Sequence, residues 1–84
     1  MKSLQIQHQL HCHLDIQTGS LERLLRMIRV RGYCVQSMSL DMQKSAYLIN
    51  LIVSGERAVD NLLWQLRKLA DVHSVELGPY KSRI

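Results

Sequence analysis

The segment HCHLDIQTGSLERLLRMI, residues 11–28, changes its hydrophobic period from that of a strand to that of a helix within a few residues. Its first half alternates polar and apolar side chains, which predicts a β-strand from Ile6 to Ile16 with one covered face. Its second half follows the i, i+3, i+4, i+7 spacing of an amphipathic helix, with apolar residues Leu21, Leu24, Leu25 and Ile28. The polar residues QTGS between the two halves predict the connecting turn.

The rest of the chain repeats this alternation. Gly32 predicts a left-handed end to the first helix. Extended patterns at 33–42 and 46–54, separated by the polar reversal QKS, predict a β-hairpin. A second amphipathic helix is expected to start at Ser54 and Gly55, with one apolar face formed by Val59, Leu62, Leu63, Leu66 and Leu69. The segment VHSVELG, 72–78, predicts a last strand.

The predicted order βαββαβ indicates an α+β fold, a ferredoxin-like sandwich with two helices on one face of a four-stranded antiparallel sheet. In this arrangement the first strand pairs with the third and the fourth. We expect one domain over residues 1–84, with a core at about 4–79 and a short C-terminal tail at 80–84. Cys12 and Cys34 then lie on strands that do not touch, and we expect both to be free thiols.

The composition is that of a globular domain, with 46% hydrophobic and 21% charged residues among 84. No apolar run approaches the ~20 residues that a membrane span requires, and the first residues do not form a signal-peptide pattern. We therefore expect a cytoplasmic protein without membrane contact. The formal net charge of +4 is dispersed along the chain and gives only a mild bias toward acidic partners.

His11 and His13 stand two residues apart on one face of the first predicted strand. Such a pair can bind a transition metal. A polar outer sheet face, or one packed on another subunit, explains the pair as well, and the sequence offers no second pair of ligands. We expect no metal site and treat both histidines as candidate partner contacts.

Trp64 is expected to point away from the apolar face of the second helix, given ~100° of rotation per residue. Isolated outward Trp residues are common, but Trp is also enriched at interface hot spots. Trp64 is therefore a third candidate partner contact.

Four arginines lie on or just after the first helix, and they suit either a solvated helix face or phosphate contacts: Arg23, Arg26, Arg29 and Arg31. Sheets of this fold bind RNA by stacking bases on aromatic side chains. Because the chain has no Phe and its three Tyr match no such motif, we do not expect nucleic-acid binding. The sequence has no nucleophile elbow, P-loop or metalloprotease motif, and we expect no catalytic residues.

The turn before the first helix allows two interpretations. A glycine at this place leaves the first helical amides free, so the N–H groups of Gly19, Ser20 and Leu21 could receive a carboxylate. Alternatively, the side chain of Thr18 or Ser20 caps the helix and satisfies those amides, which is the commoner arrangement.

Two segments resemble a known family: TGSLERLLRMIRVRGYCVQSMSL, 18–40, and LWQLRKLADVHSVELG, 63–78. They are similar to the ACT domain of the small regulatory subunits of acetolactate synthase, also called acetohydroxyacid synthase, of the short isozyme II type. The matching positions are Gly19, Leu21, Arg23, Arg31, Gly32, Tyr33, Ser37, Gln65, Leu66, Lys68, Leu69, Asp71 and Val72.

The resemblance implies a non-catalytic subunit that activates a large catalytic subunit in the biosynthesis of valine, leucine and isoleucine. In this family the large subunit carries thiamine diphosphate, magnesium and FAD, and we expect the small chain to bind no cofactor. The resemblance also implies a homodimer with side-by-side sheets, and an amino acid held between the strand-to-helix loop of one chain and the second strand of the other. Carried onto this sequence, the effector-binding positions are Thr18, Gly19, Ser20, Leu21, Cys34 and Val35.

This chain departs from valine-sensitive members at Ile16 and Cys34, where those members often carry Asn. A lost hydrogen bond to a charged group costs ~1.5 to 3 kcal/mol. We therefore expect a vestigial effector site with a weak or absent valine response. Two alternatives remain at this stage: a stand-alone amino-acid-sensing ACT module, and a nucleic-acid-binding domain of the same fold.

Overall fold

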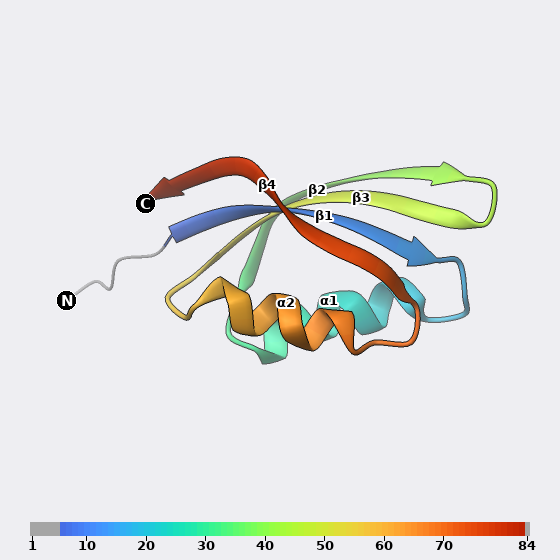
Figure 1. The fold of residues 1–84 in the computed structure, drawn as a ribbon, viewed down its shortest axis with the longest axis horizontal. Coiled ribbons are helices and arrows are strands. Elements are labelled where there is room, and N and C mark those ends of the chain that lie inside the picture. The colour runs from blue at the N-terminus through green and yellow to red at the C-terminus, as the bar shows by residue number, and fades with distance from the viewer. Residues whose placement is uncertain (1–5, 84) are drawn as a thin grey trace.

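The structure is a computed structural model that describes residues 6–83, with side chains described as far as Gly78, and it confirms the predicted fold class and element order (Figure 1). The strands are β1 (Ile6–Asp15), β2 (Cys34–Gln43), β3 (Ala46–Gly55) and β4 (Val72–Arg83), and the helices are α1 (Ser20–Val30) and α2 (Val59–Arg67). The strands form one antiparallel sheet in the order β2-β3-β1-β4, and both helices cover the same face of it.

Strand β1 is central because it pairs with both β3 and β4, as predicted. Its even-numbered side chains point toward the helices, and Leu10 and Leu14 have no solvent exposure. The remaining core residues come from every element except β2: Cys12, Leu24, Ile28, Ile49, Leu51, Val53, Leu62, Leu63, Leu66 and Val75, with Tyr33 just before β2. The even positions of β1 thus form the floor on which both helices pack.

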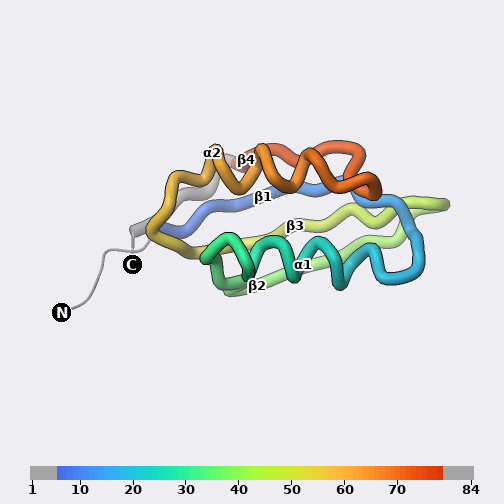
Figure 2. The backbone as a smooth tube through the Cα atoms, turned by 90° about the horizontal axis from the view of Figure 1, so that it is seen from below, coloured from blue at the N-terminus to red at the C-terminus, as the bar shows by residue number. Residues whose placement is uncertain are grey.

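The helices divide the covered face between them. Figure 2 shows α2 lying along β4 and β1, and α1 lying along β3 and β2. Neither helix, within residues 6–83, is long and apolar enough to cross a membrane.

Helix α1 ends in the left-handed turn that Gly32 predicts. Gly32 has a φ of +92° and its amide donates to the Arg29 carbonyl at 3.0 Å, while the Tyr33 amide donates to the Ile28 carbonyl at 3.1 Å. This pair of bonds is a Schellman motif, in which a glycine with positive φ satisfies the last carbonyls of the helix. The motif turns the chain back so that Tyr33 enters the core.

Several boundaries differ from the prediction. Helix α2 starts at Val59 and ends at Arg67, because Gly55 still belongs to β3 and pairs with Ile6. Leu69 therefore lies beyond the helix, although it still packs against the core. Strand β4 continues to Arg83, into the segment expected as a tail, and the expected start of the core at residue 4 lies outside the described residues.

Gly55 is required because the ring of Tyr33 occupies the place of a side chain. A Cβ atom at Gly55 would lie 2.6 Å from Cδ2 of Tyr33. Tyr33 is 3% exposed, and its hydroxyl donates a hydrogen bond to the Arg57 carbonyl. The ring therefore fixes the end of β3 and the turn that leads to α2.

We expect Gly55→Ala to lower the free energy of unfolding by ~1 to 3 kcal/mol, because the added methyl group overpacks the core against the Tyr33 ring. Urea denaturation followed by circular dichroism measures the change. Tyr33→Leu combined with Gly55→Ala should recover part of the loss, and equal midpoints for Gly55→Ala and the wild type would contradict this packing.

Candidate functional site

The loop before α1 has the shape of an amide pocket, but only part of it is open. Gly19 precedes the helix with a φ of +76°, and no side chain caps the helix. The prediction of a Thr18 or Ser20 cap is therefore wrong. The Ser20 hydroxyl instead accepts a 3.4 Å hydrogen bond from the Gln17 amide, and the Ser20 amide donates to the Gln17 carbonyl at 3.0 Å. Because these two bonds occupy the amides of Gln17 and Ser20, the amides of Gly19 and Leu21 are the places where an anion could approach.

Arg23 covers one side of this loop. Its Nη1 atom would lie 3.0 Å from a Cβ atom at Gly19, so the guanidinium lies close to the glycine. The same guanidinium forms an ion pair with Asp71, with Nε 2.9 Å from Oδ2. Asp71 also accepts a 2.8 Å hydrogen bond from the Asp15 amide through its backbone carbonyl. Asp71 therefore ties the end of β1 to α1 across the turn.

Sequence reasoning placed Arg23 and Asp71 among the positions that match the family but assigned them no contact. The two residues are 48 positions apart, so no local pattern connects them. In the sequence, only their positions in the two segments that resemble the family indicate that Arg23 and Asp71 belong to one site.

Cys34 and Val35 do not meet the loop within one chain. They line an open hollow of about 660 Å³ between α1 and β2, together with Leu25, Tyr33 and Met38 and a polar rim of Glu22, Arg26 and Arg29. Cys34 follows the C-terminal end of α1, whereas the loop precedes its N-terminal end. The 11 residues of the helix separate the two by roughly 16 Å, at a rise of ~1.5 Å per residue. A single chain therefore cannot hold one small ligand against all six predicted positions.

The outer face of the sheet carries the histidines. His11 is exposed and His13 is half-buried, and the His13 ring centroid lies 5.1 Å from that of His73. His73 in turn contacts the Asp15 carboxylate as an ion pair when its ring is protonated. Among residues 6–83, no three His, Cys, Asp or Glu side chains are arranged to hold a metal ion.

Trp64 lies on the outer side of α2, as predicted, with 60% of its surface exposed. The Lys68 ammonium lies 5.4 Å from the centre of the indole ring. Cation and ring are close enough for a favourable cation–π contact.

The two thiols differ sharply. Both cysteines are free, with Cys12 buried and Cys34 exposed. Burial raises the pKa of the Cys12 thiol from 9.0 to about 12, because the apolar core disfavours the thiolate. Cys12 is therefore an inert core residue, and Cys34 is the accessible thiol of the described chain.

Comparisons with known proteins agree with the geometry. Residues 17–75 match the ACT domain family. The chain is 40% identical over 74 residues to the acetolactate synthase isozyme 2 small subunit of Escherichia coli K12, covering 86% of this chain and 85% of that protein. It is 32% identical to the chloroplastic acetolactate synthase small subunit 1 of Nicotiana plumbaginifolia over 77% of this chain and 15% of that protein.

A solved structure shares the fold. The crystal structure of the ACT domain from GTP pyrophosphokinase of Chlorobium tepidum superposes with a TM-score of 0.76 at 16% identity, covering 88% of this chain and 99% of that one.

We expect a thiol reagent to modify Cys34 rapidly in the native protein and Cys12 only after unfolding, because the thiolate is the reactive species and Cys12 is buried. With a chromogenic reagent at neutral pH, the absorbance should show one thiol per chain modified rapidly in the native protein and two in denaturant. Cys34→Ser should leave no fast equivalent, and fast modification of that variant would contradict the assignment.

The raised pKa of Cys12 also predicts a loss of stability in alkali. The thiol is neutral in both states below pH 9.0, and above it the unfolded chain ionises first, so stability falls as pH rises toward about 12. Each pKa unit corresponds to ~1.4 kcal/mol, so the loss is at most ~4 kcal/mol. The difference in unfolding free energy between the wild type and Cys12→Ala should shrink over this range, and a constant difference would contradict it.

Proposed function

Since the chain belongs to the ACT-domain small subunits of acetolactate synthase, we propose that it activates a large catalytic subunit in branched-chain amino-acid biosynthesis and carries out no chemistry itself. The single observation behind this proposal is 40% identity over 86% of this chain and 85% of the bacterial relative. The catalytic chemistry then belongs to the large subunit. We propose that the large subunit carries thiamine diphosphate, magnesium and FAD, and that both chains act in the cytoplasm.

Activation needs no contact with substrate. A partner that binds the competent conformation of a catalyst better than its alternatives raises the competent fraction. A preference of ~1.4 kcal/mol corresponds to a factor of ten in that equilibrium. A rigid domain with a well-packed core can supply this preference through its surface alone.

We further propose that two copies pair through β2. This strand is at the edge of the sheet, and nine of its ten residues are exposed, all but Leu40. Its helix-facing side carries Val35, Met38 and Met42, of which Met42 is 64% exposed. A long apolar edge strand is an aggregation hazard unless another strand pairs with it. The opposite edge, β4, has two register shifts in its pairing with β1, whereas β2 has one in its pairing with β3, so β2 is the more regular of the two edges.

Pairing through antiparallel β2 strands would also complete the effector site. It would bring the start of β2 in one copy toward the α1 loop of the other, which one chain cannot do. The amide of Leu21 and the left-handed Gly19 would offer a carboxylate site, but Ile16 and Cys34 lack the amide side chains that orient an amino acid. We therefore propose that valine binds weakly or not at all.

Reconstitution tests the activating role. Mixing the purified chain with an acetolactate synthase large subunit should raise acetolactate formation about tenfold, and millimolar valine should change the stimulated rate less than about twofold. The control is heat-denatured chain at the same concentration. An unchanged rate with the native chain would contradict the proposed activation. Strong inhibition by valine would contradict the prediction that Ile16 and Cys34 weaken valine binding.

Sedimentation tests the pairing. We expect a dimer for the wild type and at least a tenfold weaker association for Met38→Lys, because the lysine places a charge in the apolar interface. Ser39→Lys adds the same side chain to the outer face of the same strand and should leave the dimer intact. A Met38→Lys variant that sediments like the wild type would place the interface elsewhere.

A further inference from the structure

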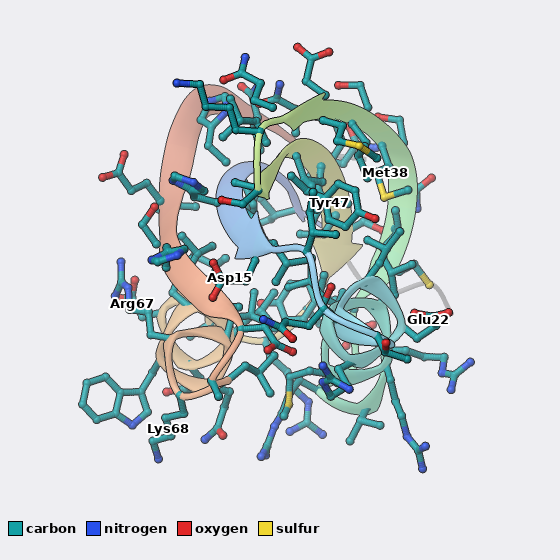
Figure 3. All side chains as sticks on the ribbon, turned by 90° about the vertical axis from the view of Figure 1, so that its right-hand side faces the viewer. Asp15, Glu22, Met38, Tyr47, Arg67 and Lys68 are labelled. Carbon is teal, nitrogen blue, oxygen red and sulfur yellow. The ribbon has the colours of Figure 1, made fainter. Side chains whose placement is uncertain are left out.

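One flank of the molecule combines exposed apolar and basic side chains, and the proposed dimer does not use it. This α2–β4 flank is formed by Trp64, Arg67, Lys68 and Leu77. Trp64 is 60% and Leu77 is 45% exposed. Leu77 lies on the helix-facing side of β4, because it pairs with the buried Leu10 of β1. In Figure 3, Arg67 and Lys68 lie on one side of the molecule, and Glu22 and Met38 lie on the opposite side.

The polar groups of the flank are held in place. Trp64, Arg67 and Lys68 are spaced i, i+3 and i+4, so they share one side of α2. The Lys68 ammonium rests 5.4 Å from the indole ring, and the Arg67 guanidinium donates a 3.0 Å hydrogen bond to the Val75 carbonyl. An indole ring and a backbone carbonyl carry no net charge. Both side chains are thus oriented, and neither forms an ion pair with a side chain that the structure describes.

The helix side of the molecule as a whole, α1 and α2 together, carries more basic than acidic residues. Seven of the 11 Lys and Arg residues lie on the two helices or in the turns next to them: Arg23, Arg26, Arg29, Arg31, Arg57, Arg67 and Lys68. The same segments hold four acidic residues, Glu22, Glu56, Asp60 and Asp71, so the helix side carries a net charge of +3. The outer sheet face instead carries Asp15, Asp41 and Glu76 among polar residues. The helix side therefore suits an acidic partner, and the sheet side does not.

We propose that the α2–β4 flank is the surface through which this chain contacts the catalytic subunit, at an acidic patch with an apolar recess that receives the Trp64 indole. The inference rests on the proposed function and adds to it the contact surface and its chemistry. A large aromatic side chain seated in a desolvated pocket typically dominates an interface, while surrounding charges speed encounter and set orientation. The flank has one such anchor and two cations beside it.

A protein partner fits these observations better than a nucleic acid. Recognition of single-stranded nucleic acid uses several aromatic platforms along a basic groove. This flank offers a single exposed indole, and the Lys68 ammonium lies 5.4 Å from the centre of its ring. The exposed apolar side chains of Trp64 and Leu77 favour an apolar counterpart, which a folded protein surface supplies.

Titrating the full chain into an acetolactate synthase large subunit measures the small-subunit concentration that gives half-maximal stimulation. Trp64→Ala should raise this concentration at least about tenfold, since the substitution removes an interface anchor but leaves the core intact. Lys68→Glu should raise it by ~3 to 10-fold, and its effect should diminish in high salt, which screens exposed charges. Lys44→Glu, on the exposed β2–β3 turn, makes the same charge change away from the flank and should shift it less than about twofold.

The outcomes separate the two proposals. If the wild type neither binds nor stimulates the large subunit, the proposed function fails and the flank fails with it. Suppose instead that the wild type stimulates the large subunit, and that folded Trp64→Ala and Lys68→Glu reach half-maximal stimulation at the same concentration as the wild type. The proposed contact at the α2–β4 flank is then overturned, and the proposed function stands. If Lys44→Glu and Lys68→Glu raise the half-maximal concentration equally, the effect depends on the overall charge of the chain, and the contact at the flank is also overturned. Salt-resistant binding of single-stranded RNA that Trp64→Ala abolishes, with stimulation unaltered, would assign the flank to nucleic acid.

Discussion

The structure depends on covering one face of the central strand β1. Its even-numbered side chains from His8 to Leu14 are buried on the helix side, and its backbone is paired on both sides by β3 and β4. Because successive side chains of a strand point to opposite faces, this choice commits the odd-numbered residues to the uncovered face. His11, His13 and Asp15 lie there for this reason. Their grouping reflects the strand period, and it assembles no metal site among the residues that the structure describes.

The turn before α1 illustrates how one fold can keep the outline of a binding loop while altering its chemistry. Gly19 preserves a left-handed backbone next to a helix without a side-chain cap. The helix-end amides of an uncapped helix favour anions. However, Arg23 lies over the glycine and is held there by Asp71. The loop is thus fixed by a contact between distant segments, which stabilises its conformation whether or not a ligand is present.

The strand order separates two surfaces with different properties. The α1–β2 side is an apolar hollow beside an exposed edge strand, suited to a second copy of the same chain. The α2–β4 flank carries Arg67 and Lys68 beside a single exposed indole, and we propose a different partner for it. An ACT domain that both dimerises and contacts a catalytic subunit needs two such surfaces, because one surface cannot be buried against two partners at once. The division follows from placing β2 and β4 at opposite edges.

The sequence by itself determined the elements, because helix and strand periods are local properties that neighbouring residues express. It predicted α1, the β2–β3 hairpin, the buried face of β1 and the left-handed Gly32, and it placed Trp64 outside the core. Tertiary structure decided where β3 ends, because the Tyr33 ring packs against Gly55. As a result Gly55 stays in β3, and α2 begins only at Val59. It also decided the contact between Arg23 and Asp71, and it showed that Cys34 lies a helix length away from the Gly19 loop. These features depend on which distant segments meet, and a local hydrophobic period carries no information about such meetings.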